Sequence, residues 1–141
     1  MNISNNGIEL IKQFEGLRLE VYQCTAGVWT IGWGHTSGVK QGDKITTEQA
    51  LDFLRSDLEK FENVINNLVT VELNQNQYDA LVSFVFNIGI NAFKQSTMLK
   101  FLNAGHFSLA AGQFDRWVKC NGITLEGLVK RRKAEKELFL A

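Results

Sequence analysis

The stretch NGIELIKQFEGLRLEVYQCTAGVWTIGWGHT, residues 6–36, decides the fold class. Its first part repeats apolar side chains with a helical period, and Asn6 is expected to cap that helix. From residue 17 to residue 35 the period changes to two, which predicts an antiparallel hairpin closed by a Thr25-Ala26-Gly27 turn. A helix therefore leads directly into a hairpin, and we expect Glu15, the last helical residue, to lie where these elements meet.

The remainder of the chain is expected to be mainly helical. Thr46 and Gln49 are expected to form a capping box at the start of a helix, in which apolar residues recur every three or four positions from Ala50 to Leu68. Asn74 opens the next helix, which is apolar nearly all round and is expected to end at Gly89. A third strand is expected near Val39. Shorter helices are predicted further along the chain, at residues 95–103, 106–118 and 126–139.

The length of 141 residues fits a single domain, residues 1–141, with one hydrophobic core. We expect an α+β architecture in which a small antiparallel β lobe lies beside a larger helical lobe, with a cleft between them. The expected β lobe covers about residues 17–45, and the helical lobe covers about 46–141 together with the helix at 6–15.

Fifteen Lys and Arg residues balance fifteen Asp and Glu residues. A net charge of zero argues against a general nucleic-acid binder, which needs a basic excess or stripe. No run approaches about eighteen apolar residues, so no membrane insertion is expected, and the N-terminal residues lack the features of a signal peptide. Cys24 and Cys120 are both expected to stay reduced in a cytoplasm.

Glu15 ends a helix, where the helix dipole disfavours a negative charge, and it lies among apolar residues. A carboxyl that keeps its proton is what general-acid cleavage of a glycosidic bond requires. Position alone also allows an ordinary solvated glutamate at a helix end. Glu15 is therefore a candidate general acid.

Cys24 and Thr30 form a second candidate pair. If the turn is centred on Gly27, the two residues are equally distant from it and face each other across the hairpin. A thiol and a hydroxyl would then point together towards the side where Glu15 is expected. The alternative is an ordinary strand threonine and a cysteine that serves as a small hydrophobe.

Six motifs along the chain closely resemble the phage-type lysozymes, which are endolysins of the glycoside hydrolase class. The motifs are FEGLRLEVY at 14–22, WTIGWGHT at 29–36, LNQNQYDAL at 73–81, FNIG at 86–89, FKQST at 93–97 and GLVKRRKAE at 127–135. They occur in the family's order and with compatible spacing over essentially the whole chain. The resemblance implies a lysozyme-like fold.

The family's catalytic pattern is a glutamate, an aspartate nine positions on, and a threonine six positions beyond that. Glu15 and Thr30 match the first and third positions, whereas Cys24 occupies the aspartate position. A thiolate could replace the carboxylate as base or nucleophile if its pKa is lowered. The resemblance therefore implies Glu15, Cys24 and Thr30 as the catalytic residues.

Other matching positions supply the expected support and substrate contacts. The resemblance implies that His35 is a structural brace and that one arginine of the 130–133 run lies against the catalytic glutamate, with Arg131 favoured over Arg132. The run could instead be a solvated helix face. The expected substrate-binding residues are Thr36, Phe86, Asn87 and Ser96.

The resemblance implies a muramidase that cleaves the β-1,4 bond between N-acetylmuramic acid and N-acetylglucosamine of bacterial peptidoglycan with inversion, and a Cys24 thiolate would also allow a covalent double-displacement route. No cofactor is expected, because protons and water suffice, and the Cys and His residues lack the spacing of a metal site. We expect a monomer that accumulates in the host bacterial cytoplasm, is released to the wall for lysis, and has glycan strands as its partner. One alternative is a catalytically silent peptidoglycan-binding homologue. Another is an amidase or peptidase with Cys24 as nucleophile and His35 as base.

Overall fold

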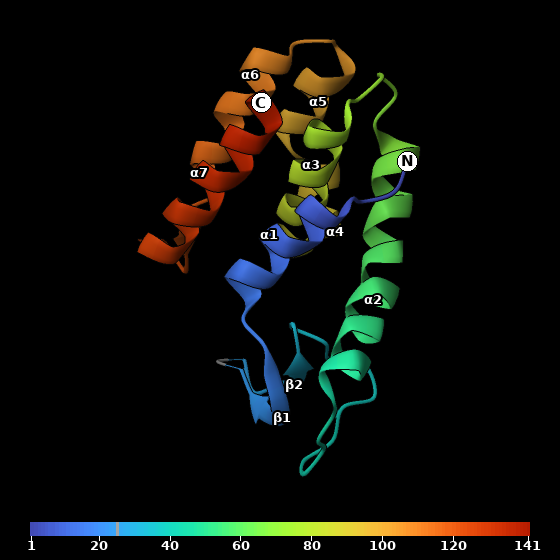
Figure 1. Ribbon diagram of the computed structural model, residues 1–141. Helices are drawn as coiled ribbons and strands as arrows, with labels where there is room; N and C mark the ends of the chain where they lie inside the picture. Colours follow the sequence, from blue (N-terminus) through green and yellow to red (C-terminus); the bar gives the residue numbers. More distant parts are fainter. Residues whose placement is uncertain (25) are drawn as a thin grey trace. The chain divides into compact units, whose positions relative to one another are not determined.

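The structure is a computed structural model that describes residues 1–24 and 26–141. The chain forms two compact units, one of residues 9–60 and one of residues 1–8 with residues 61–141. Helices α1 (Asn5–Glu15) and α2 (Thr47–Leu68) each contribute to both units (Figure 1).

The start of α1 is fixed by α3 (Gln75–Ile88) rather than by Asn6. The expectation that Asn6 caps the helix is wrong, because the helix already begins at Asn5. The residue before the helix, Ser4, donates hydrogen bonds from its main-chain N–H and its hydroxyl to Asp79, which is completely buried in α3. The carboxylate thus ties the N-terminal segment to the helical unit.

The unit of residues 9–60 contains the predicted hairpin, made by β1 (Arg18–Gln23) and β2 (Trp29–Gly32). Thr25, part of the predicted turn, lies outside the described residues. The third strand expected near Val39 is not found in the described chain, because the N–H of Val39 closes a turn on the carbonyl of Thr36. The segment that returns to β1 comes later, where Ile45 N–H bonds to the carbonyl of Leu19.

The predicted starts of α2 and α3 are confirmed at the level of single hydrogen bonds. Thr46 and Gln49 exchange side-chain and main-chain hydrogen bonds at 2.9 and 3.1 Å, and Asn74 makes the same reciprocal capping box with Gln77. Gly89, with a φ of 95°, ends α3.

The C-terminal half is more finely divided than its apolar pattern indicated. The segment expected to be helical at 106–118 breaks into α6 (Phe107–Gly112) and a 3₁₀ helix, η1 (Gln113–Arg116). A small hairpin of β3 (Lys119–Cys120) and β4 (Ile123–Thr124) follows. The remaining helices of this half are α4 (Ile90–Lys94), α5 (Thr97–Asn103) and α7 (Glu126–Leu140).

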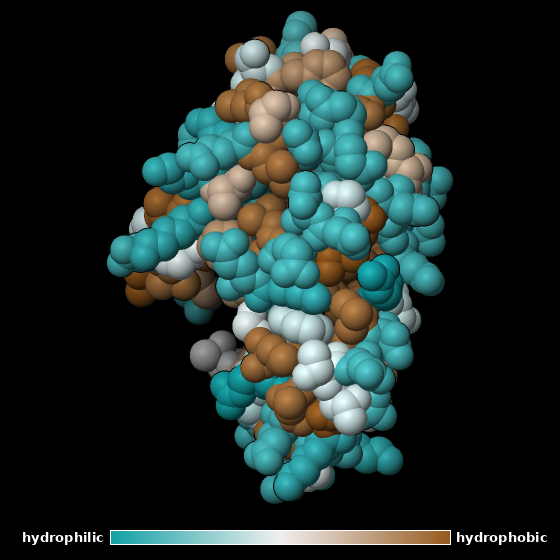
Figure 2. Space-filling view, viewed as in Figure 1, coloured by the Kyte–Doolittle hydropathy of each residue, from teal (hydrophilic) through white to brown (hydrophobic). Residues whose placement is uncertain are grey.

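The core of the larger unit is built on α3, which packs along α7 (Figure 1). Phe84 of α3 meets Phe114 edge to face at 5.0 Å, and Phe114 meets Phe139 at 5.7 Å. On the face shown in Figure 2, hydrophilic residues cover most of this unit, and apolar side chains form smaller groups between them. None of the described helices is long and apolar enough to cross a membrane.

Gly7 offers a direct test of this packing. A Cβ atom there would lie 2.6 Å from Ile3 Cγ1 and 2.8 Å from Asp79 Cβ, so we expect Gly7→Ala to lower the free energy of unfolding by about 1–3 kcal/mol. Gly112→Ala is the matched control, because Gly112 has helical dihedral angles and open space around it. Alanine there should raise stability by about 0.4–1 kcal/mol. Urea unfolding of both variants checks the prediction, and equal stabilities would contradict it.

Candidate active site

Glu15 lies at the end of α1, half-buried, beside the turn that follows β2. Its carboxylate comes so close to Gly34 that a Cβ atom on that residue would be 3.2 Å from Glu15 Oε1. The φ of Gly34 is +80°, which also favours glycine. On the preceding turn of α1, the Lys12 ammonium lies 4.7 Å from the centre of the Trp33 ring. The turn after β2 thus leaves space for the Glu15 carboxyl, because Gly34 has no side chain.

Cys24 and Thr30 lie on the same side of the hairpin, although their predicted direct pairing is wrong. Thr30 is opposite Tyr22, and Cys24 N–H donates to the carbonyl of Val28 at 3.0 Å. The turn is therefore centred on Ala26, one residue before the predicted centre. This moves the pairing by two residues, which keeps Cys24 on the face of Thr30 because strand side chains alternate with a period of two.

The Cys24 thiol is surrounded by hydrogen-bond donors. Main-chain hydrogen bonds at Val28 and then Ala26, together with the hydroxyl of Thr30, lower its pKa below that of an ordinary thiol, although partial desolvation opposes them. Thr30 is buried, and its hydroxyl donates to the carbonyl of Val28 at 3.0 Å. The same hydroxyl proton can turn to the sulfur when the thiolate forms, because a hydroxyl rotates to suit its acceptor.

His35 joins the end of the hairpin to α2. The residue is buried, its Nδ1 lies 2.8 Å from Asp57 Oδ2, and its ring stacks on Phe53 with centroids 4.2 Å apart. Phe53 and Asp57 are one helical turn apart, so they present one face of α2 to the imidazole. The imidazole thus has a stacking partner and a carboxylate partner on α2.

The basic run at 130–133 is solvated only in part, because Lys130 and Lys133 are exposed whereas the two arginines between them are not. Arg131 and Arg132 are buried and meet Glu135 at 3.2 and 2.8 Å. Ser83 donates to Glu135 at 2.5 Å, and its carbonyl accepts from Arg131 at 3.1 Å. Burial raises the pKa of Glu135, and the two arginines and the serine oppose that shift. This buried cluster joins α7 to α3.

The remaining predicted substrate residues have different surroundings. Thr36 is exposed after His35, whereas half-buried Phe86 packs edge to face on Phe61 at 5.2 Å. Exposed Asn87 accepts a hydrogen bond of 2.6 Å from Arg132, so a ligand would meet its amide N–H group. Ser96 is buried and caps α5, because its hydroxyl donates to Phe93 and accepts from Leu99.

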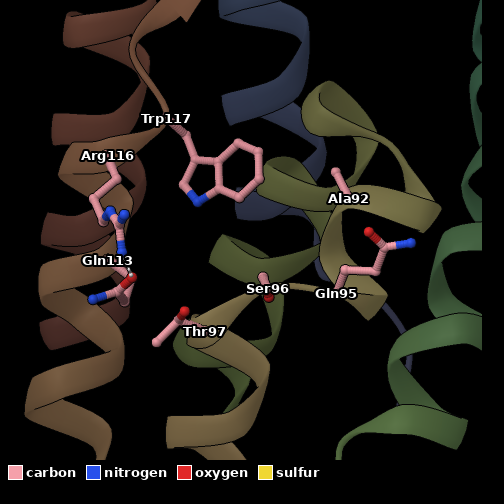
Figure 3. Close-up of a pocket in the computed structure, with 7 residues that line it drawn as sticks. All are labelled: Ala92, Gln95, Ser96, Thr97, Gln113, Arg116 and Trp117. Carbon is pink, nitrogen blue, oxygen red and sulfur yellow. Dashed lines mark hydrogen bonds between the residues drawn. The ribbon is translucent and has the colours of Figure 1, made fainter.

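A pocket of about 500 Å³ lies on the larger unit, and Figure 3 shows its lining. We call it the Trp117 pocket. Its lining residues are Ala92, Gln95, Ser96, Thr97, Gln113, Arg116 and Trp117. Only Ser96 was indicated by the sequence, since the others come from segments that no local pattern connects. Trp117, a tryptophan inside the helix predicted at 106–118, was the one available signal.

A short antiparallel hairpin after the first helix, followed by a mainly helical chain, defines an α+β protein of the lysozyme-like class. The solved muramidase domain of SpmX from Asticaccaulis excentricus has this fold, with a TM-score of 0.95 and 48% sequence identity over 99% of this chain and 98% of that one. A solved point mutant of P22 lysozyme gives a TM-score of 0.90 at 44% identity, over 100% of this chain and 99% of that one.

The chain belongs to the phage lysozyme family, whose model matches residues 12–135. It is 53% identical to an endolysin of Acyrthosiphon pisum secondary endosymbiont phage 1, over 99% of this chain and 98% of that protein. Phage lysozymes are glycoside hydrolases, so the chain is placed among enzymes rather than among binding modules.

Proposed function

We propose that the chain is a muramidase that hydrolyses the β-1,4 bond between N-acetylmuramic acid and N-acetylglucosamine in peptidoglycan, for lysis of a bacterial host. The observation that carries the proposal is the placement of Glu15, Cys24 and Thr30 within one compact unit, residues 9–60, of a phage lysozyme chain. The test is loss of turbidity of a wall suspension with the full chain, compared with variants of Glu15 and Cys24.

Glu15 is the proposed general acid. Its carboxyl protonates the glycosidic oxygen as the bond to the anomeric carbon breaks, and a water molecule attacks that carbon from the opposite face. Inversion at the anomeric carbon follows. The absence of a side chain at Gly34 favours this role, because it leaves space for the Glu15 carboxyl next to the turn that follows β2.

Cys24 is the proposed base for the attacking water. Its lowered pKa makes thiolate available at lower pH than an ordinary thiol would, and the thiolate takes the proton that the water loses. Thr30 positions the water and stabilises the thiolate by turning its hydroxyl to the sulfur. Direct attack of the thiolate on the anomeric carbon is the competing route, and it would leave a glycosyl adduct detectable by mass.

Arg131 is the proposed positioning residue for the general acid, and Thr36, Phe86, Asn87 and Ser96 are the proposed substrate contacts. The support for Arg131 is the family resemblance of the 127–135 motif, and its buried guanidinium is held by Glu135 and Ser83. The support for Asn87 is its hydrogen bond with Arg132, which sets the direction of the amide.

The cysteine peptidase alternative is disfavoured by the surroundings of His35. A thiol nucleophile needs a base within hydrogen-bond reach. In the described part of the chain, His35 has Asp57 and Phe53 as partners, and the hydrogen-bond partners of Cys24 are the turn and Thr30. The other alternative, a silent binding module, differs from the enzyme only in having no turnover. The rate of turbidity loss with the wild type and the Cys24 variants tests this difference.

The proposed enzyme acts as a monomer without nucleic acid and collects in the host cytoplasm until a membrane lesion gives it access to the wall. The balanced charge of the chain supports the absence of a nucleic-acid partner. Size-exclusion chromatography and fractionation of producing cells before and after lysis test the oligomeric state and the location.

Cys120 is expected to have no role in this chemistry. It is a free, exposed thiol in the β3–β4 hairpin, so Cys120→Ser should change the lysis rate by less than about twofold, as surface substitutions do. Equal losses for Cys120→Ser and Cys24→Ser, with two hydrogens missing from the mass of the wild type, would reveal a disulfide and contradict this prediction.

A further inference from the structure

The turn between β1 and β2 is held by hydrogen bonds from both the main chain and a side chain. Cys24 N–H donates to the carbonyl of Val28 at 3.0 Å, and Gly27 N–H donates to the carbonyl of Cys24 at 2.8 Å. Gln23, the last residue of β1, donates from Nε2 to the carbonyl of Gly27 at 3.2 Å. The Gln23 amide therefore joins the end of the strand to the far side of the turn.

A single peptide group connects the Gln23 amide with the Cys24 sulfur. The carbonyl of Gly27 and the N–H of Val28 belong to the same planar peptide, so fixing the direction of one fixes the direction of the other. The carbonyl accepts from Gln23, and the N–H forms the main-chain hydrogen bond that contributes most to lowering the pKa of Cys24. Gln23 thus acts on the sulfur through one rigid group of atoms.

Gly27 leaves this peptide with little steric restraint. Its φ is +77°, and apart from its chain neighbours no described atom lies within 4 Å of the position that a Cβ atom would take. Glycine rotates about its main-chain bonds more freely than any other residue. The Val28 side chain is exposed, so its packing holds the peptide only weakly. The hydrogen bond from Gln23 therefore limits the rotation of the peptide.

The direction of these donors matters because hydrogen bonds, with Val28 first, favour the thiolate of Cys24. Among the described residues, no charged group contributes to the lowered pKa of Cys24, and partial desolvation opposes it. The charged and titratable side chains of β1 have other partners: Arg18 lies 4.5 Å from the centre of the Tyr22 ring, and Glu20 pairs with Lys44 at 3.6 Å. Strand β2 contains no such side chain.

We infer that Gln23 is a positioning residue for Cys24, because its amide holds the Gly27–Val28 peptide with the N–H directed at the sulfur. The inference rests on the proposed function, since it identifies what keeps the proposed base in its reactive form. A hydrogen bond to an ionised acceptor is stronger than one to a neutral acceptor, so a fixed donor stabilises the thiolate more than the thiol.

The test is the pH dependence of alkylation of Cys24 by iodoacetamide, which reacts with the thiolate. The full chain carries Cys120→Ser, so that only one thiol reacts. Gln23→Met keeps the length of the side chain and removes the donor. We expect it to raise the midpoint of the titration by about 0.5–1 pH unit, which lowers the alkylation rate below the midpoint about threefold to tenfold.

Gln23→Glu gives a second measurement with the same side-chain length. Its carboxylate cannot donate to the Gly27 carbonyl and adds a negative charge, so the midpoint should rise at least as far as in Gln23→Met. A rise in Gln23→Glu alone would assign the effect to charge and overturn the inference. Gln41→Met is the matched control, because Gln41 is an exposed glutamine of the same unit, and its midpoint should equal that of the parent.

The rate of turbidity loss separates positioning from a general distortion of the hairpin. On the rising limb of the pH profile, Gln23→Met should lower the rate about threefold to tenfold when residue 24 is cysteine. In Cys24→Asp the same change should alter the rate by less than about twofold, because the aspartate is already ionised there. Equal losses in the two proteins would mean that the hairpin is distorted, which overturns the inference.

The alkylation experiment needs no turnover, so failure of the inference can be distinguished from failure of the proposed function. If Gln23→Met leaves the midpoint unchanged while Cys24→Ala is inactive, Gln23 has no positioning part and the proposed base stands. If Gln23→Met raises the midpoint but Cys24→Ala lyses walls as fast as wild type, the proposed base is wrong. The role of Gln23 in the reaction is then overturned with it.

Discussion

We expect Glu15→Gln to abolish lysis, with a loss of activity of about 10²–10⁴-fold, the range that general acid catalysis contributes. Glutamine keeps the size and polarity of the side chain at the end of α1 but has no proton to deliver to the leaving oxygen. The measurement is the initial rate of turbidity loss with a wall suspension, together with the unfolding midpoint of the variant.

Glu9→Gln is the matched control for this prediction. It makes the same change on an exposed face of the same helix, where Glu9 forms an ion pair with Lys12 at 3.3 Å, a surface contact that contributes little to stability. The control should lyse walls at the wild-type rate. Activity of Glu15→Gln within about tenfold of wild type, with the fold intact, would remove Glu15 from the role of general acid.

Cys24→Ala should have the second-largest effect, a loss of about 100-fold or more, because it removes the base and leaves Thr30 without its sulfur partner. Cys24→Asp should retain activity, since a carboxylate restores the family's residue at this position. In a Cys120→Ser background, iodoacetamide should inactivate the protein with Cys24 and spare the protein with Cys24→Asp. If Cys24→Ala lyses walls as fast as wild type, the thiol has no chemical part.

The pH profile distinguishes the thiolate from the carboxylate. The pKa of Cys24 is lowered, so the thiolate increases with pH at values below those of an ordinary thiol, and the rate should rise with it. In Cys24→Asp this rising limb should disappear, because an aspartate carboxylate is already ionised in the pH range in which a thiol titrates. A rising limb that is the same in both proteins would assign the titration to another group.

The elements with clear end signals could be predicted from the sequence. Capping residues at Thr46 and Asn74 and the glycine at Gly89 define helix ends through local hydrogen bonds and dihedral angles, which depend on neighbouring residues alone. Glu15 was placed correctly at the end of α1 for the same reason. The family resemblance then connected these elements to a lysozyme-like fold, which the solved relatives confirm.

The register of the hairpin could not be obtained in this way. A shift of two residues leaves the alternation of apolar and polar side chains unchanged, so the pattern allowed Cys24 opposite Thr30 as well as the observed pairing of Tyr22 with Thr30. The β3–β4 hairpin was too short to show a period. Its signal was the Asn121-Gly122 pair, in which both residues have a positive φ, as a two-residue hairpin turn requires.

Long-range contacts account for the rest of the site. The buried ion pairs of Arg131 and Arg132 depend on Glu135 and on Ser83, which is about fifty residues earlier in the chain. The Trp117 pocket combines α4, α5 and η1. No pattern within one segment predicts such a combination. A run of basic residues looks the same in the sequence whether its side chains lie in solvent or pair with buried carboxylates.

The most direct test of the muramidase function is identification of the bond that is cut. Purified peptidoglycan would be digested with the wild type, and new reducing ends and new free amines would be measured on the same sample, with Glu15→Gln as the blank. We predict new reducing ends on N-acetylmuramic acid that increase as turbidity falls, with no increase in free amines. New free amines without reducing ends would contradict glycoside cleavage and identify the chain as a peptidase or amidase.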